Sequence, residues 1–201
     1  MALPAPHFLC ERASHHYNQG MSSAPDTPHR MSEERFLALP ESMQRQELID
    51  GEVYVSPSPN IGHQRAVGAL FVLLRQWASG PGNAFIGLSP LDVRVAPGHI
   101  VQPDLFVLLG GTPASTPIDE VPDLVIEVLS SNQSYDRLLK RYVYEQAGVR
   151  EYWMVDVEAG VIEIAVDGAL SEHHDTLTSD VLEGFVVHVA AVCGGSDASE
   201  H

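Results

Sequence analysis

The first half of the chain alternates between strand-like and helix-like spacing of its apolar residues. Ser32 followed by Glu33 and Glu34 predicts a short capped helix. Asp50-Gly51 between two short apolar runs predicts a β-hairpin over 47–55. Residues 56–60 break that strand, and the helix that follows ends at Gly80-Pro81-Gly82. Its apolar positions recur at i, i+3, i+4 and i+7 and form one face: Val67, Leu70, Phe71, Leu74, Trp77 and Ala78.

The second half predicts strands on both sides of a second helix. Three apolar segments near 84–95, 101–109 and 123–130 have strand character, and a polar loop from 110 to 122 separates the last two. An amphipathic helix is expected over 134–147, closed by Gly148, with an inward face of Leu138, Leu139, Tyr142 and Val143. Strands at 151–156 and 161–166 follow, and then a weaker pair near 170–176 and 185–189. This order predicts a single α/β domain with a mixed sheet flanked by helices.

The ends of the chain lack this periodicity. Residues 1–30 are rich in Pro, Ser and His and are expected to form a disordered extension, with Met21 and Met31 as alternative start sites. The folded domain is expected over 31–191, followed by a tail over 192–201.

Composition adds constraints on location and partners. A net charge of −16 over 201 residues argues against the broad basic surface that drives non-specific nucleic-acid binding. The two cysteines, Cys10 and Cys193, show no metal-binding spacing and favour a reducing compartment. The chain also shows no secretion signal and no apolar run long enough to span a membrane. A cytoplasmic protein is therefore expected.

Two acidic residues lie on consecutive predicted strands. Asp104 follows Pro103 at the start of one strand, and Glu127 stands between Ile126 and Val128 in the next. An exposed strand end would explain either acid alone. Burying a carboxylate in such a run is costly unless a cation or hydrogen bonds meet it. If the two strands form a hairpin, the carboxylates can approach closely, and oxygen ligands of this kind suit Mg²⁺ or Mn²⁺.

Asp123 lies in the same predicted strand as Glu127 and could be mistaken for a second metal ligand. The two would share a face but lie roughly 13 Å apart at the rise of a strand, too far to hold one metal. Asp123 is therefore assigned to the start of the strand.

Lys140 on the second predicted helix has two interpretations. Asp136 precedes it by four residues, which favours an ordinary surface ion pair. The helix also leaves directly from the end of the Glu127 strand, so Lys140 could instead fold back over the carboxylates and stabilise transition-state charge.

Four more residues are secondary candidates. Glu47 at the start of the hairpin is a possible further acid. His63 shares the inward stripe of its helix and is more often a satisfied core histidine than a ligand. Gln102 and Tyr142 could orient the metal-binding side chains through contacts with them.

These residues stand in an ordered set that resembles the Uma-type family of bacterial restriction-endonuclease-like proteins, which have the PD-(D/E)XK nuclease fold. The similarity spans roughly residues 32–190. It rests on the segments 47–52, 57–59 with His63-Gln64, 89–94, 102–104, 122–130, Asp136 with Lys140, and 148–156.

The resemblance implies roles for the candidates. Asp104 and Glu127 would hold the metal, Lys140 would be the catalytic lysine, and Glu47 would be an additional acid. The wider nuclease pattern has a lysine two residues after the glutamate, where this chain has Leu129. The resemblance implies that this lysine has moved to the helix as Lys140. A homodimer is also expected by resemblance.

Three functions remain open at this point. The first is Mg²⁺-dependent hydrolysis of DNA through Asp104, Glu127 and Lys140. The second is a catalytically silent binding or regulatory module on a nuclease fold, motivated by the charge of −16. Hydrolysis of a small phosphate ester is less favoured, since no glycine-rich phosphate loop is found. DNA binding would need one locally positive face, for which the candidates are Arg65, Arg75, Arg94, Arg137 and Arg141.

Overall fold

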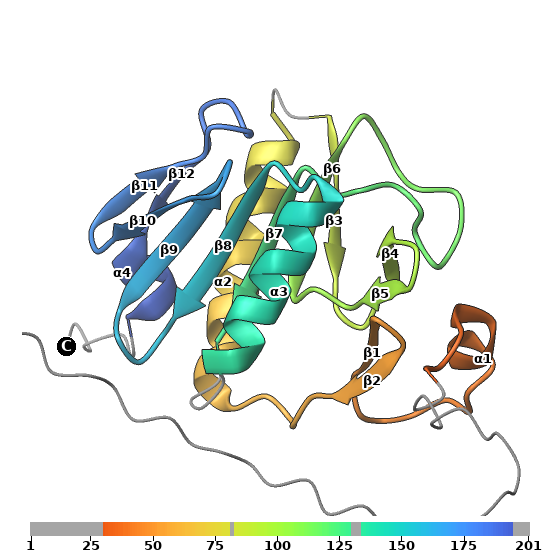
Figure 1. Cartoon of the computed structure of the whole chain (residues 1–201). Coiled ribbons are helices and arrows are strands. Elements are labelled where there is room, and N and C mark those ends of the chain that lie inside the picture. The colour runs from red at the N-terminus through yellow and green to blue at the C-terminus, as the bar shows by residue number, and fades with distance from the viewer. Residues whose placement is uncertain (1–29, 81–82, 130–133, 195–201) are drawn as a thin grey trace, which may run out of the picture.

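A six-stranded mixed sheet forms the centre of the protein (Figure 1). The computed structural model describes residues 30–80, 83–129 and 134–194. Strands β7 and β8 run parallel, and every other neighbouring pair in this sheet is antiparallel. The expected mixed α/β architecture is confirmed. In spatial order the strands are β10 (Ala169–His173), β9 (Val161–Val166), β8 (Glu151–Asp156), β7 (Leu124–Val128), β6 (Leu105–Leu109) and β3 (Ala84–Leu88).

A separate four-stranded sheet lies beside it. Asp50 and Gly51 have positive φ values of 52° and 77°, as a tight hairpin turn requires, so the predicted hairpin is confirmed. The segment expected as one strand over 84–95 is instead two strands in different sheets, because the chain bends at Ser89-Pro90 before it continues. The order of this sheet is β2 (Glu52–Val55), β1 (Gln46–Ile49), β5 (His99–Val101) and β4 (Val93–Ala96).

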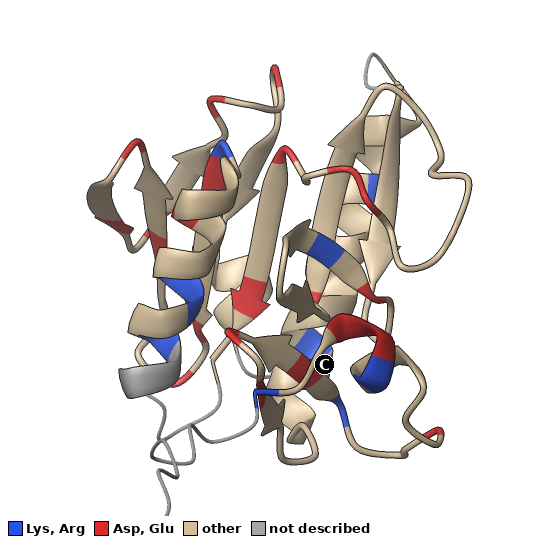
Figure 2. Ribbon diagram, turned by 45° about the vertical axis from the view of Figure 1, so that its right-hand side comes forward, with Lys and Arg blue, Asp and Glu red and all other residues tan. Residues whose placement is uncertain are grey.

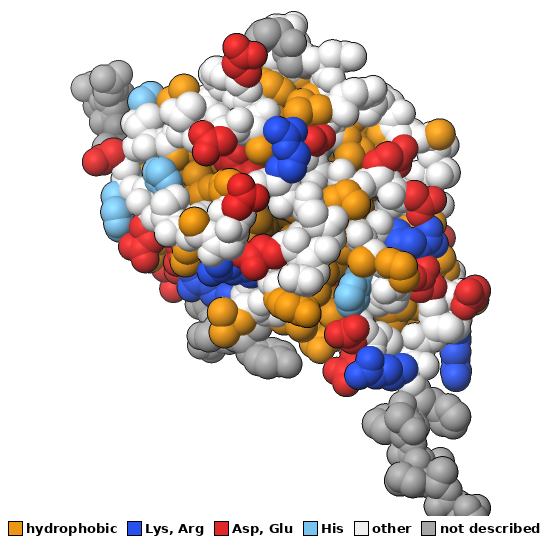
Figure 3. All heavy atoms as spheres, turned by 45° about the horizontal axis from the view of Figure 1, so that its top comes forward, with side chains coloured by type: hydrophobic (Ala, Val, Ile, Leu, Met, Phe, Trp, Pro, Cys, Tyr) orange, Lys and Arg blue, Asp and Glu red, His pale blue; other side chains and the backbone are white. Residues whose placement is uncertain are grey.

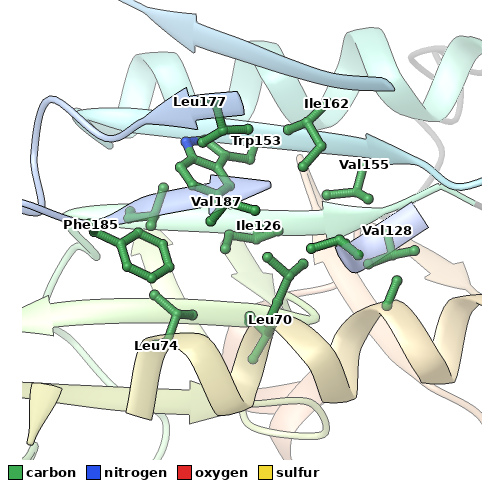
Figure 4. Packing of buried hydrophobic residues seen from close by; sticks show 14 of the residues in the cluster. Leu70, Leu74, Ile126, Val128, Trp153, Val155, Ile162, Leu177, Phe185 and Val187 are labelled. Atoms are coloured by element: carbon green, nitrogen blue, oxygen red, sulfur yellow. The ribbon is translucent and has the colours of Figure 1, made fainter. Parts of the chain in front are cut away.

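Helix α2 (Ile61–Ala78) covers one face of the large sheet. Leu70 and Leu74 are fully buried against strand residues such as Ile126 and Trp153 (Figure 4). The predicted apolar face of this helix is therefore confirmed. The same core is completed by α4 (Val189–Cys193) and by the hairpin β11 (Thr176–Thr178) and β12 (Val186–His188).

Helix α3 (Ser134–Ala147) lies on the opposite face of the large sheet, in front of it in Figure 1. The predicted inward face is partly wrong. Leu138 is 69% exposed and Tyr142 is 58% exposed, whereas Val143 and Tyr144 are buried. The buried face of the helix includes Lys140. A prediction from apolar spacing assigns a charged residue to the exposed face and therefore missed this one. Acidic partners make that burial possible.

A short helix, α1 (Glu33–Leu37), packs at the outer side of the small sheet. Ser32 accepts a hydrogen bond from Arg35 N at 3.3 Å and caps the helix as predicted. Phe36 is buried against Leu48 and Ile100. In the described parts of the chain, none of the helices is both long and apolar enough to cross a bilayer.

Candidate active site

A cleft of about 620 Å³ opens where the two sheets meet the start of α2. Its lining combines strand residues of the large sheet, segments that flank the small sheet, and residues of α2 and α3. Both apolar and charged side chains face the hollow. It is large enough for a ligand, and five of the seven sequence candidates line it: Asp104, Glu127, Lys140, His63 and Gln102.

Asp104 and Glu127 face each other across two paired strands. Asp104 lies at the point where the chain passes from β5 to β6, and β6 pairs with β7 so that Leu105 is opposite Ile126. One step further along this register brings Asp104 beside Glu127. The backbone N–H of Val128 donates to Asp104 Oδ2 at 2.8 Å. Both acids are buried, so neither is an exposed strand-end residue.

Lys140 reaches these carboxylates from α3. Its Nζ lies 2.8 Å from Glu127 Oε1 and 2.9 Å from Glu47 Oε2, and the lysine is buried. The Glu47 side chain comes from β1 and is also buried. The alternative partner, Asp136, has a side chain outside the described part of the structure. Lys140 is thus an interior cation that joins two acids from different sheets.

The pair stays charged at neutral pH. Burial alone would raise the pKa of Glu127, but the charges of Lys140 and Arg45 outweigh it and lower the pKa to about 2. Burial likewise works to lower the pKa of Lys140, but Glu127 and Glu47 raise it above its ordinary value. Each buried charge is therefore kept ionised by its neighbours.

Arg45 is a central residue that the sequence analysis missed. Its Nη1 donates to Asp104 Oδ1 at 2.6 Å, and its Nη2 lies 3.1 Å from Glu127 Oε2 and 3.3 Å from Glu47 Oε1. These three acids raise its pKa, although burial acts against them. Arg45 extends the β1–β2 ladder, where its carbonyl accepts from Ser56 N. Strand alternation places it on the same face as Glu47 two residues later, so the sequence contained the signal.

His63 and Gln102 hold the acids from the sides. The Nε2 of His63, in the first turn of α2, lies 3.1 Å from Asp104 Oδ2, so this histidine faces the site as well as the core. The backbone N–H of Gln102 donates to Glu47 Oε1 at 2.8 Å, while its side chain donates to Asp92. The contact of Gln102 with the site is thus made by its backbone.

The expected contact of Tyr142 with the site is wrong, because its side chain is exposed. Tyr144 makes that contact instead, and its hydroxyl donates to Glu127 Oε1 at 2.8 Å. Burial and the charge of Glu127 raise the pKa of Tyr144 well above its ordinary value, so it remains a donor. Tyr144 follows Lys140 by four residues and shares its helix face, which is the pattern that could have identified it.

Asp123 lies at the start of β7, as predicted. It accepts a hydrogen bond from Leu109 N at 2.7 Å and pairs with Arg150 at 3.1 Å. It therefore ties the end of β6 to the start of β7 and makes no contact with the metal candidates in the described structure.

Three of the five arginines proposed to form a positive face are paired with acids, while Arg65 and Arg75 are exposed on α2. Arg94 pairs with Glu33 and Asp119, Arg137 with Glu163, and Arg141 with Glu145. Asp and Glu are spread over many loops and strand ends, with few Lys and Arg among them (Figure 2). The face shown in Figure 3 likewise has acidic side chains scattered over it. A broad basic surface is not visible in these views of the described residues.

The carboxylate oxygens of Asp104 and Glu127 are suitable ligands for a divalent cation. Asp104 and Glu127 already share one cation, the Arg45 guanidinium, so their oxygens converge on a common position. The described residues contain no group of three or more His, Cys, Asp or Glu placed to hold a metal by themselves. Mg²⁺ commonly uses one or two carboxylates and completes its shell with water and substrate oxygens, so this pair fits.

Comparison with known proteins agrees with the architecture. The Uma2 family, described as "putative restriction endonuclease", matches residues 33–190. A crystal structure of a "putative nuclease" from Anabaena variabilis superimposes with a TM-score of 0.70 at 18% identity, over 81% of this chain and 97% of that one. No curated protein matches the sequence. The similarity to the Anabaena protein shows a common fold, and the match over residues 33–190 shows that this chain belongs to the Uma2 family of restriction-endonuclease-like proteins.

Proposed function

We propose that the protein hydrolyses DNA phosphodiester bonds with Mg²⁺ or Mn²⁺. The observation that supports this most directly is the convergence of Asp104, Glu127 and Lys140 in one cleft. Asp104 directly precedes β6, Glu127 lies in β7 and Lys140 lies in α3. Arg45 joins the two acids, and Lys140 contacts Glu127 at 2.8 Å. Membership of a family described as restriction endonucleases supports DNA as the substrate.

In this proposal Asp104 and Glu127 hold the metal. A bound divalent ion lowers the pKa of an attacking water and polarises the scissile phosphate. The Val128 N–H and His63 both contact Asp104 Oδ2, which fixes the orientation of that carboxylate. Tyr144 does the same for Glu127.

Lys140 would stabilise the negative charge that develops on the phosphate. An ammonium has three donors, and Lys140 uses its contacts with Glu47 and Glu127 to hold its position. Glu47 keeps the ammonium charged and directed at the centre. Because Lys140 and its acidic partners are buried, a charge held there acts more strongly than the same charge in solution.

The surface charge favours local rather than extended contact with DNA. The paired arginines and the net charge of −16 predict weak, salt-sensitive binding, with the cleft as the main contact. The same observation favours the second candidate, a silent module on a nuclease fold. A homodimer would place two clefts on one duplex and is part of the nuclease proposal.

A cleavage assay with supercoiled and linear DNA at low salt tests the proposal. With Mg²⁺ or Mn²⁺ the wild type should cut, and the double variant Asp104→Ala/Glu127→Ala should lose about 1,000-fold or more in rate. Asp123→Ala is the matched control, an acid at the start of the same strand that should keep its activity. Equal cutting by wild type and double variant would reject the assignment. DNA binding without metal-dependent cutting would favour the silent module.

A further inference from the structure

Arg45 contacts both of the acids that are proposed to hold the metal. We propose that this guanidinium is an exchangeable counter-ion, which neutralises Asp104 and Glu127 in the metal-free protein and is displaced from them when a divalent cation binds. The inference rests on the proposed function and adds a competition between Arg45 and the metal for the same two carboxylates. It makes Arg45 a positioning residue that sets the affinity for the metal.

The individual carboxylate oxygens show why the two cations compete. Asp104 Oδ2 is occupied by the Val128 N–H and His63, and Glu127 Oε1 by Lys140 and Tyr144. The other oxygen of each acid, Asp104 Oδ1 and Glu127 Oε2, has Arg45 as its hydrogen-bond donor, at 2.6 and 3.1 Å. A divalent ion held by Asp104 and Glu127 would therefore compete with Arg45 for these carboxylates.

The charge count also favours exchange over addition. Three carboxylates (Glu47, Asp104 and Glu127) face two cations (Lys140 and Arg45), which leaves one net negative charge. A divalent ion that replaces Arg45 makes the group neutral. The same ion added beside Arg45 would place three cationic groups against three acids in a buried volume, with repulsion between ion and guanidinium.

The cleft offers a second position for the displaced side chain. Arg45 Nε is buried and has no hydrogen-bond partner among the described residues. The same holds for Gln102 Oε1, and both residues line the cleft. Buried polar atoms are normally paired, so an arrangement with unmet donors and acceptors around a hollow is one that can change. A displaced Arg45 guanidinium would still border the cleft, whose lining includes the unpaired Gln102 Oε1.

Metal titration by calorimetry tests the exchange without any substrate. The full-length wild type and Arg45→Gln would each be titrated with Mn²⁺, and the variant should bind at least tenfold more tightly because no guanidinium has to be displaced. Arg137→Gln is the matched control. This substitution removes one positive charge from the same cleft. Arg137 pairs with Glu163 and not with Asp104 or Glu127, so the Mn²⁺ affinity of the variant should differ less than threefold from that of the wild type.

Arg45→Lys covers the case in which the glutamine variant does not fold. It keeps the charge, but an ammonium cannot span two carboxylates as a planar guanidinium does, so Mn²⁺ affinity should rise above that of the wild type. Thermal unfolding with and without Mn²⁺ gives a second measurement. The metal-induced rise in Tm should be larger in both Arg45 variants than in the wild type.

The outcomes separate this inference from the proposed function. Wild-type binding with equal or weaker binding by the Arg45 variants would overturn the exchange and leave the nuclease proposal standing. Binding by the Arg45 variants alone would support the exchange and count against a metal-dependent wild type. If neither protein binds Mn²⁺, both proposals fail.

Discussion

Two neighbouring strands of the large sheet each bury a glutamate, and the two glutamates are satisfied in different ways. Glu127 on β7 meets two cations, Lys140 and Arg45, beside an open cleft. Glu151 on β8 meets neutral donors: Trp153 Nε1 at 2.5 Å, Ser179 Oγ at 2.8 Å, and the backbone N–H groups of residues 180 and 181, each at 3.1 Å.

Burial alone therefore does not separate a candidate site acid from a structural one. Three of the four donors to Glu151 come from the turn at 179–182, so that carboxylate anchors the loop before β12 to the sheet. The donors to Glu127 are the side chains of Lys140, Arg45 and Tyr144, and residues with unpaired buried polar atoms among the described part of the chain line the adjacent hollow. Charged partners beside a cavity are compatible with exchange, whereas neutral donors within the core indicate a structural role.

The largest expected effect comes from removing the buried cation. Lys140→Met leaves Glu47 and Glu127 with Arg45 as their remaining cation, and breaking a buried pair in this way typically costs about 4 kcal/mol. We expect urea unfolding at pH 7 to show a loss of this size.

The adjacent residue provides the control for this change. Arg141→Met removes a cation from the partly exposed side of the same helix, where its pair with Glu145 should contribute under about 1 kcal/mol. Similar losses in the two variants would mean that Lys140 is not tied to the acids as described.

A smaller loss is expected at the structural glutamate. Glu151→Gln replaces a charged acceptor that serves four donors, which should lower the free energy of unfolding by about 3 kcal/mol. Mn²⁺ affinity of the folded variant should match the wild type, because Glu151 does not contact the site acids. Exposed Glu158→Gln serves as the control for stability, and a change in Mn²⁺ affinity in Glu151→Gln would remove the distinction between the two glutamates.

The smallest effect is a dependence on pH. The folded pKa of Glu127 is about 2, below the ordinary value of 4.5, so its stabilising contribution is present above pH 4.5 and is lost as the pH falls toward 2. Between pH 5 and pH 3 the metal-free wild type should lose about 2 kcal/mol more stability than Glu127→Gln. Chemical denaturation at several pH values measures this, and parallel curves for the two proteins would contradict the lowered pKa.

Local pattern was sufficient to predict most of the fold. Helical spacing correctly predicted the apolar face of α2, and the Asp50-Gly51 turn correctly predicted the hairpin. The assembly of β1, β2, β4 and β5 into a second sheet was not predicted, because it depends on pairing between distant segments.

Only part of the candidate site was predicted, because it too depends on contacts between distant segments. The position of Asp104 opposite Glu127 follows from strand pairing, and Lys140 reaches both Glu127 and Glu47. Apolar periodicity misplaced Tyr142, because the inward stripe of α3 contains a charged residue that such a pattern treats as exterior. Arg45 was missed because its partners come from distant segments, although its spacing from Glu47 was visible.

The contacts of the site also have a kinetic meaning. They join residues 59, 82 and 93 positions apart in the chain, across both sheets and α3. Contacts between such remote segments form late, since long loops must close first. During refolding the cluster of buried acids and cations should therefore assemble in the last step, after the hairpin and α2, so that burial of this cluster reports the fully native protein.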